Sequence, residues 1–381
     1  MKIGKILAMA AVATVFASCS NEEELANVGK SESNAIRFAG ISGLSDTRTT
    51  PIGTTNLTTT DFDVMAFMSS DNALFMGGKH VSGVSDHGVK IVYKTSAWDY
   101  ADPDQMAYWP TEGDVDFYAV SPAISNDLVL DNGFAYDMTS VAKTISYRMV
   151  DEYNTTGTNH DVMYAVAKGR NKVNNGTNAV QMNFKHILSQ VVFKAKTASS
   201  ILEVDVENVK IHNFVHGGTF TLPEGEPTMS NWSTSPDEAV FTATVKLNAA
   251  NVKTNNAVVE LSDMNSPLMM IPQKLTKWSP STGAAVSKHV ADTKKECYLE
   301  ISMKLKQNDS YLIGSATEYK TVYVPFDNGT GWEPGKRYIY TLIFGGGYDD
   351  QGEPILSPIK FEAATEDWAN ASAGADADVN F

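Results

Sequence analysis

The sequence has very little cysteine, since Cys19 and Cys297 are its only two. We expect Cys19 to be consumed near the N-terminus, as argued below, which leaves Cys297 without a partner and excludes an intramolecular disulfide. Cys297 lies in Glu296-Cys297-Tyr298-Leu299 at an expected strand start. We interpret it as a small, semi-buried apolar residue.

Positive charge is also scarce, with 30 basic against 45 acidic side chains. Without residues 1–18, which contain Lys2 and Lys5, the chain keeps 28 basic and 45 acidic residues and a formal charge of −17. Such a surface repels phosphate backbones, which argues against nucleic acid as a partner.

Long apolar runs are missing except at the N-terminus, where one extends from Ile6 to Phe16. This run is too short to cross a bilayer, and it follows Lys2 and Lys5 and precedes small residues. Residues 1–18 are therefore predicted to be an export signal peptide. An ordinary secretory signal, in which the cysteine at its end is incidental, is the alternative.

The residues after this signal specify the kind of export. Ala17-Ser18-Cys19 resembles the lipobox of bacterial lipoproteins, in which the cysteine is acylated and becomes the mature N-terminus. The polar stretch Ser20-Asn21-Glu22-Glu23-Glu24 resembles the acidic export tag of Bacteroidetes surface lipoproteins. We therefore predict lipidation, such as palmitate, at Cys19, an anchor in the outer membrane, and a flexible tether that begins at residue 19.

Catalytic and metal-binding motifs are not found. His212 and His216 flank an expected strand, where residues four apart lie about 13 Å from each other, so they cannot share a metal. His216 is followed by two glycines, but the chain has no Gly-x-Ser-x-Gly nucleophile elbow. Asp99, Asp102 and Asp104 suit a solvated turn better than a cation site. We assign no catalytic residue, cofactor or metal, and expect that the protein is not an enzyme.

Extended helical periodicity is lacking, and period-two alternation takes its place. Alternating segments with β-branched and aromatic residues occur at residues 203–207, 241–247, 299–306, 337–344 and 359–363. Turn residues separate them, so we predict an all-β chain of Greek-key β-sandwiches in tandem. Val141, Ile145 and Met149 suit one short helix, and a single strand is expected from Asn183 to Lys196.

Aromatic residues gather at Trp98, Tyr100, Tyr108 and Trp109. Such a group can stack on sugars, but in β-sandwiches it more often packs in the core or at its rim.

A set of short motifs, together with the lipobox and Arg48, gives the chain a resemblance to the fimbrillin family of Bacteroidales type V pili. The motifs occur in the family's order: Tyr108-Trp109-Pro110, Asp116-Phe117-Tyr118-Ala119, Asp161-Val162-Met163-Tyr164-Ala165, Phe184-Lys185-His186-Ile187-Leu188-Ser189, Pro267-Leu268-Met269-Met270-Ile271-Pro272-Gln273 and Trp332-Glu333-Pro334-Gly335-Lys336-Arg337-Tyr338-Ile339-Tyr340. We interpret His186 as a core or interdomain histidine.

The resemblance implies two transthyretin-like β-sandwich domains, which we place at residues 49–180 and 181–381, behind a removable segment at 19–48. It also implies a lipoprotein precursor whose subunits join other fimbrial subunits by strand exchange after an arginine-specific protease cuts the N-terminal segment. A host protein or glycan is a possible adhesion target.

Arg48 is the predicted processing site. It lies in the polar stretch Asp46-Thr47-Arg48-Thr49-Thr50, and exposed stretches of this kind are where proteases cut. Arg37 is the competing site, but it lies within a strand candidate at residues 35–42.

The C-terminal residues 369–381 are predicted to be the donor strand. Every odd position is apolar: Ala369, Ala371, Ala373, Ala375, Ala377, Val379 and Phe381. Every even position is polar or glycine, so the segment suits an extended strand that enters a preformed groove. A weakly biased tail is the alternative.

The main prediction is therefore a structural or adhesive subunit of a cell-surface fimbria. The rival is a monomeric surface lipoprotein that binds glycans.

Overall fold

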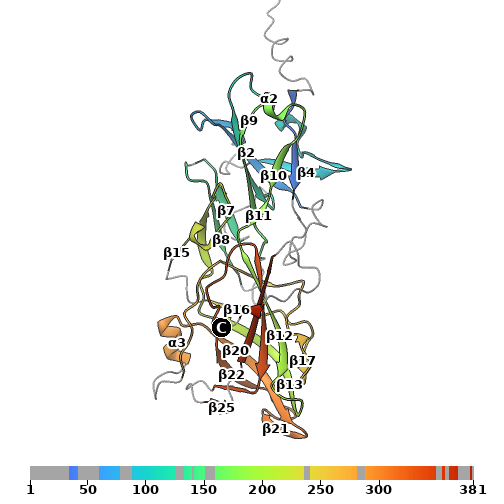
Figure 1. The fold of residues 1–381 in the computed structure, drawn as a ribbon, viewed down its shortest axis with the longest axis vertical. Helices are drawn as coiled ribbons and strands as arrows, with labels where there is room; N and C mark the ends of the chain where they lie inside the picture. The colour runs from blue at the N-terminus through green and yellow to red at the C-terminus, as the bar shows by residue number, and fades with distance from the viewer. Residues whose placement is uncertain are drawn as a thin grey trace, which may run out of the picture.

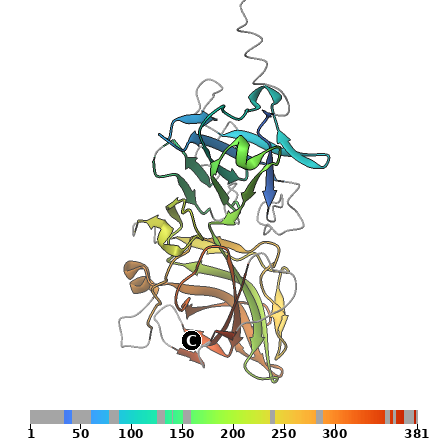
Figure 2. The same cartoon turned by 45° about the horizontal axis from the view of Figure 1, so that its top comes forward.

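The computed structural model describes residues 34–41, 60–77, 88–124, 133–139, 141–150, 159–235, 241–280, 288–348, 354–356, 360–367 and 378–379. The molecule is elongated, with its N-terminal and C-terminal halves at opposite ends (Figures 1 and 2). The described α-helices are α2 (Lys172–Asn175) and α3 (Lys288–Lys294), and nearly everything else regular is strand. The predicted all-β architecture is confirmed. Neither described helix has the length and apolar character that crossing a membrane requires.

A seven-stranded sheet forms the centre of the N-terminal half. Its strand order is β11 (Lys185–His186), β9 (Met163–Arg170), β6 (Val115–Ser121), β2 (Phe62–Met68), β4 (Val89–Lys94) and β5 (Ala97–Tyr100), with β3 (Leu74–Met76) paired to β2. The first six residues of β2 are all buried, which is typical of a strand covered on both faces.

The two faces of this sheet belong to different cores. Phe62 and Val64 of β2 join one cluster of buried side chains, together with residues of β1 (Phe38–Ile41) and β10 (Val180–Asn183). Met65 and Phe67, on the opposite face of β2, belong to a larger cluster that continues into the C-terminal half. The first of these cores contains the candidate functional site.

A four-stranded sheet is built from both halves of the chain and lies between them (Figure 1). Its order is β15 (Trp232–Thr234), β14 (Gly217–Thr221), β8 (Thr144–Arg148) and β7 (Phe134–Asp137). β8 pairs antiparallel with β14 from Thr144↔Thr221 to Arg148↔Gly217. The helix expected around Ile145 is therefore wrong. The alternation in Thr144–Arg148 buries Ile145 and Tyr147 on one face and determines a strand.

The C-terminal half contains two sheets. One has the order β18 (Val259–Glu260), β12 (Ser189–Thr197), β23 (Lys336–Phe344), β26 (Lys360–Asp367) and β27 (Asp378–Val379), with β19 (Leu268–Met270) paired to β12. The other has the order β16 (Thr242–Thr244), β13 (Leu202–His212), β20 (Tyr298–Gln307), β22 (Lys320–Pro325), β24 (Gly346–Tyr348) and β25 (Pro354–Leu356), with β17 (Val252–Thr254) on β13 and β21 (Ser310–Ile313) on β20. The alternating segments predicted at 203–207, 299–306 and 337–344 lie in β13, β20 and β23.

The strand expected from Asn183 to Lys196 is divided in the structure. Lys185 and His186 form β11 and pair with β9 of the N-terminal sheet, whereas β12 begins at Ser189 in a C-terminal sheet. β12 then pairs in parallel with β23 over eight residues. The chain thus passes from one half to the other between His186 and Ser189.

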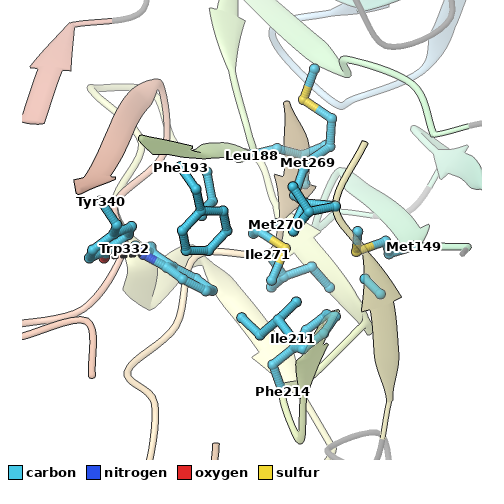
Figure 3. Close-up of a cluster of buried hydrophobic side chains, with 14 of the residues drawn as sticks. Met149, Leu188, Phe193, Ile211, Phe214, Met269, Met270, Ile271, Trp332 and Tyr340 are labelled. Carbon is cyan, nitrogen blue, oxygen red and sulfur yellow. Dashed lines mark hydrogen bonds between the residues drawn. The ribbon is translucent and has the colours of Figure 1, made fainter. Parts of the chain in front are cut away.

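The larger core extends from one half to the other. Met149 from the N-terminal half belongs to the same cluster as Phe214, Met269 and Trp332 (Figure 3). Trp332 is fully buried, and its Nε1 donates to the hydroxyl of Tyr340 at 2.9 Å. Cys297 is also fully buried in this core, and burial raises the pKa of its thiol well above the usual value. Cys297 is therefore a packing residue with little thiolate at neutral pH.

Gln273 and Trp332, from two of the resemblance motifs, and Asn328 between those motifs hold the loops around this core. The Gln273 amide accepts from Val215 N at 2.8 Å and donates to Val215 O at 2.8 Å. Asn328 donates to Gln273 O at 2.8 Å and accepts from Leu275 N at 3.0 Å. Trp332 N donates to Gln273 O at 2.9 Å. Buried backbone groups of three loops are satisfied in this way.

Asp63 is a buried residue of β2 whose carboxyl group contacts Tyr136 of β7. Its Oδ2 accepts from Ile124 N at 2.8 Å and from the Tyr136 hydroxyl at 2.9 Å. Burial raises the pKa of Asp63 to about 7, against the opposing effect of these hydrogen bonds. Asp63 is therefore largely protonated in the folded protein below neutral pH.

This raised pKa predicts a pH-dependent stability. Protonated Asp63 stabilises the fold fully below about pH 4, and the contribution is lost as the pH rises through about 7, at up to ~1.4 kcal/mol per pH unit. Asp63→Asn is neutral and can accept both hydrogen bonds. We therefore expect its free energy of unfolding to fall less between pH 5 and pH 8 than that of wild type. Urea unfolding at several pH values measures this. Asp61→Asn, at a partly exposed neighbouring carboxyl, is the control, and identical slopes for Asp63→Asn and wild type would contradict the prediction.

Candidate assembly site: the N-terminal strand and its groove

The N-terminal segment 34–41 fills a groove in the N-terminal half, and we call it the N-terminal strand. Its regular part, β1, pairs in parallel with β10 from Phe38↔Val180 to Ile41↔Asn183. Ala35, three residues before β1, forms an antiparallel bridge with Tyr108. The segment is thus paired on both sides by pieces of chain far away in the sequence, and a strand is confirmed within the stretch predicted at 35–42.

Backbone hydrogen bonds hold the N-terminal strand along both margins of the groove. Ile36 N donates to Ala107 O at 2.9 Å, and Trp109 N donates to Asn34 O at 3.0 Å. On the other margin, Val180 N donates to Arg37 O at 2.7 Å. These bonds belong to the backbone, so another extended segment could make them with a different sequence.

The floor of the groove is apolar and aromatic. Ile36 is fully buried and Phe38 is 4% exposed, whereas Arg37 between them is exposed. The Phe38 ring lies 6.0 Å from the Tyr100 ring and 5.6 Å from the Phe117 ring, both in edge-to-face geometry. Removing the N-terminal strand would therefore expose a large apolar surface beside unpaired backbone groups.

The third inward position of the N-terminal strand is Gly40, which lies against Trp98. A Cβ added at Gly40 would lie 3.2 Å from three atoms of the Trp98 indole. That distance is shorter than ordinary van der Waals contact, so the site suits glycine. The groove therefore offers two large side-chain sites and one position with almost no room.

Three of the four clustered aromatic residues, Trp98, Tyr100 and Trp109, are buried in the core that contains this groove, and Tyr108 pairs its backbone with Ala35. Trp98, Tyr100 and Trp109 are between 2% and 7% exposed. The Tyr100 hydroxyl donates to Ile36 O at 2.9 Å, and burial raises the pKa of Tyr100, so the phenol stays protonated. For Trp98, Tyr100 and Trp109 the structure shows the packing interpretation, because their buried rings are not available for stacking on sugars.

The other sequence candidates have structural environments of their own. The His186 ring contacts Asp161, with Nδ1 and Oδ1 2.9 Å apart, beside the crossing between the halves. His212 Nε2 lies 3.3 Å from a Glu300 oxygen, and the hydrogen-bonding histidine lowers the pKa of Glu300 to about 2. His216 stacks on Phe241 with ring centroids 4.1 Å apart. No group of three or more metal-ligating side chains occurs within the described ranges.

The acidic residues at 99–104 cap a turn. Asp102 Oδ1 accepts from Asp104 N at 3.0 Å at the start of a 3-10 turn, Pro103–Gln105, and Asp99 accepts from Tyr100 N at 2.9 Å. One carboxylate oxygen of Asp102 and one of Asp99 thus accept from local backbone N–H groups.

Cys19 and Arg48 lie outside the described residues, as do Ala369, Ala371, Ala373, Ala375, Ala377 and Phe381 of the predicted donor segment. Asp378 and Val379 are described as β27. They pair antiparallel with β26 through Val379↔Ala363 and Asp378↔Ala364. The sequence pattern predicts Arg48 as the processing site, residues 369–381 as the donor strand and a strand at residues 35–42 with Ile36 and Phe38 on one face. It does not indicate which distant segments cover that strand.

A model of the fimbrillin-like family matches residues 47–368. The chain belongs to the fimbrillin-like family. No curated protein matches its sequence.

One solved structure shows the same fold. A fimbrial protein from Bacteroides vulgatus is 14% identical, aligns over 88% of this chain and 99% of its own, and has a TM-score of 0.56. Two proteins described as putative cell adhesion proteins have lower TM-scores. One, from Bacteroides ovatus, has a TM-score of 0.44 at 14% identity and 88% and 97% coverage. The other, from Bacteroides uniformis, has 0.42 at 12% identity and 89% and 100% coverage. At these identities the first likeness shows the fold of this fimbrillin-like chain, and the other two add no further argument.

Proposed function

We propose that this fimbrillin-like protein is a structural or adhesive subunit of a cell-surface fimbria. It is exported as an outer-membrane lipoprotein acylated at Cys19, is cut after Arg48, and assembles with other fimbrial subunits by strand exchange. Family membership supports the fimbrial part of this proposal. The groove under the N-terminal strand supports the assembly part.

The observation that carries the proposal is the position of the N-terminal strand relative to Arg48. Residues 34–41 fill the groove, and all of them precede Arg48 in the sequence. A cut after Arg48 therefore separates the strand from the rest of the chain while the margins and floor of the groove remain. The released strand is then held only by its own contacts, and a segment from another subunit can replace it.

Electron microscopy of the purified protein before and after limited digestion with an arginine-specific protease tests the assembly. We expect monomers before digestion, polymers after it, and Thr49 as the new N-terminus by mass spectrometry. Arg48→Ala should remain uncut and monomeric, whereas Arg37→Ala should behave as wild type. Polymers formed by uncut Arg48→Ala would contradict processing as the trigger.

The donor segment is tested by deleting residues 376–381. Because the deletion leaves the groove residues in place, the truncated protein should fold and be cut normally. It should fail to form detergent-resistant polymers. Circular dichroism verifies the fold, and gel electrophoresis in detergent without heating measures polymers. Assembly as extensive as that of wild type would exclude this segment as the donor.

The lipid anchor is tested by growth with a labelled fatty acid. We expect label on wild type and none on Cys19→Ala, because the thiol of Cys19 is the proposed site of attachment. Two or more acyl chains would hold the protein firmly on a bilayer, at about 0.8 kcal/mol for each buried methylene. Cys297→Ala is the matched control and should keep the label. Label on Cys19→Ala would exclude acylation at this site.

A further inference from the structure

We infer that the side chains of Lys143 and Asn72 are a site of covalent self-modification, at which they become joined by an amide bond with loss of ammonia. The two residues are 71 positions apart in the sequence. The bond connects the residue before β8, in the four-stranded sheet, to the turn between β2 and β3 of the N-terminal sheet. This inference is independent of the proposed fimbrial assembly, which proceeds with or without the bond.

The two side chains are already in hydrogen-bond contact. Lys143 Nζ donates to Asn72 Oδ1 at 3.1 Å. Because a C=O bond is about 1.2 Å long, Nζ lies within about 4.3 Å of the amide carbon Cγ of Asn72. Reacting atoms need to approach to about 3–3.5 Å, so a shift of about 1 Å in the long lysine side chain brings Nζ into attacking position.

The backbone at both residues is held in place. Lys143 O accepts from Leu222 N at 2.9 Å, and β8 begins at the next residue. Asn72 N donates to Met68 O at 2.9 Å. Asn72 has a φ of 57°, in the left-handed region that asparagine tolerates better than most residues. Two fixed pieces of backbone therefore keep the amine beside the amide, which favours the reaction between them.

Aromatic rings shield one side of the Lys143 amine from water. Lys143 is 5% exposed, and its Nζ lies 3.7 Å from the centroid of the Phe67 ring and 5.2 Å from that of the Tyr118 ring. Both rings belong to the larger core. The amine therefore meets the Asn72 amide at the margin of an apolar core.

The charges around Lys143 determine how much of it is the neutral amine, which is the attacking form. Burial lowers the pKa of Lys143, the carboxylates of Asp137 and Asp116 oppose this effect, and the positive charge of Lys168 adds to it. The pKa of Lys143 is lowered overall, so its neutral fraction at a given pH is larger than that of an exposed lysine.

Asp116 is the group to which we assign the proton that Lys143 must lose. It lies directly opposite Phe67 in the pairing of β6 with β2, so its side chain shares the sheet face on which the Lys143 amine lies. Asp116 Oδ1 accepts from Ser69 Oγ at 2.5 Å, in the turn that carries Asn72. A carboxylate is thus placed beside the amide and acts electrostatically on the amine.

The reaction balances without an oxidant or a reductant. Lys143 passes a proton to Asp116, and the neutral Nζ attacks Cγ of Asn72. The bond from Cγ to Nδ2 then breaks, and Nδ2 takes a proton from Nζ and leaves as ammonia. The ammonia takes up the proton held by Asp116 and departs as ammonium. The product is a secondary amide between Nζ and Cγ.

Peptide mapping of the purified full-length protein by mass spectrometry tests the bond. Trypsin cuts after free lysine and arginine, so an unlinked chain releases residues 49–79 and residues 95–143 as separate peptides. We expect a branched peptide in which residues 49–79 are joined to residues 95–148, because trypsin does not cut after a linked lysine. Its mass should be lower than the sum of the two peptides by one ammonia. Separate peptides with unmodified Lys143 and Asn72 would show a hydrogen bond only and would overturn the inference.

Two variants provide matched controls. Lys143→Arg keeps a positive charge beside Phe67, but its guanidinium stays protonated and does not attack the amide. Asn72→Gly removes the amide and suits the left-handed turn. Both should lack the branched peptide. Both should also migrate differently from wild type on a denaturing gel, because the bond closes a loop in the unfolded wild-type chain. Circular dichroism verifies that they fold, and wild-type migration in both variants would overturn the inference.

The role of Asp116 is tested by Asp116→Asn, which can still accept from Ser69 Oγ. We expect a smaller linked fraction than in wild type after the same time at pH 7. At pH 9 the linked fraction should recover, because the Lys143 ammonium can then lose its proton to solvent. A purely structural role of Asp116 would not give this recovery. A linked fraction equal to that of wild type at pH 7 would overturn the assignment of Asp116.

Discussion

Phe38→Ala is expected to destabilise the uncut protein by about 3–5 kcal/mol. The ring is buried between Tyr100 and Phe117, and alanine leaves a cavity that these rigid aromatic neighbours cannot easily close. Urea unfolding of the precursor measures the loss. The matched control is Arg37→Ala, since Arg37 is exposed in the same strand and its bond to Val180 uses only the backbone. The control should stay within about 0.5 kcal/mol of wild type.

The same variant separates the precursor from the assembled form. If the N-terminal strand leaves after processing, Phe38 is absent from the polymer, and Phe38→Ala should not change the rate at which polymers dissociate in detergent. A precursor as stable as wild type would show that Phe38 is not a core residue. A polymer that dissociates faster would show that the N-terminal strand stays in place.

Phe220→Ala is expected to cost a similar amount, about 3–5 kcal/mol, for a different reason. Phe220 is fully buried on β14, and its ring lies 5.4 Å from Tyr164 of the N-terminal sheet and 5.4 Å from Trp232. It therefore packs the four-stranded sheet of β15, β14, β8 and β7 onto the N-terminal half. We expect the two halves of the variant to unfold at separate urea concentrations, because this contact couples them.

Unfolding curves are recorded by fluorescence and by far-UV circular dichroism on the same samples. If the two halves unfold separately, these two curves no longer coincide. Val173→Ala is the control, since Val173 is 94% exposed on α2. Coincident curves and a loss below about 1 kcal/mol would show that Phe220 contributes little to the coupling.

Local pattern predicted the strands whose two faces differ clearly. β13, β20 and β23 alternate apolar and polar residues, and each lies where the alternation placed it. β8 was predicted as a helix because Val141, Ile145 and Met149 are four residues apart. The alternation that buries Ile145 and Tyr147 extends over only five residues, and the helical spacing was preferred to it. The partner strand β14 begins 69 residues after the end of β8, and no local pattern identifies a partner at that distance.

The groove could not be predicted for the same reason. β1 pairs with β10 about 140 residues later, and the pairing is parallel, as is that of β12 with β23. Hairpin turns between successive strands suggest antiparallel neighbours and say nothing about such pairs. Trp98, Tyr100 and Trp109 are buried only because these distant segments cover them. Their sequence neighbourhood alone is equally consistent with an exposed aromatic surface.

The motifs that carried the family resemblance gain a physical meaning from the structure. The Gln273 side chain satisfies backbone groups of Val215, and Trp332 fills the larger core. Ser189 Oγ donates to Glu333 O at 2.8 Å beside the crossing between the halves. Arg337 Nε donates to Gln190 Oε1 at 2.9 Å across the parallel pair β12–β23. These residues hold together parts of the chain that are distant in sequence, which explains why the motifs are short and widely spaced.

The four-stranded sheet that contains strands from both halves of the chain affects the order in which the chain can fold during synthesis. The N-terminal sheet presents Met65, Phe67 and Tyr118 to a core that is completed by Phe220 of β14. A nascent chain that has reached only His186 contains every strand of that sheet but lacks this cover. It also lacks β23, which β12 needs as its neighbour. The N-terminal sheet therefore remains incompletely packed until much of the rest of the chain has been synthesised. Pairs between strands so distant in sequence are expected to form slowly. In the export proposed above, this delay would extend the time in which the chain remains unfolded and can be exported.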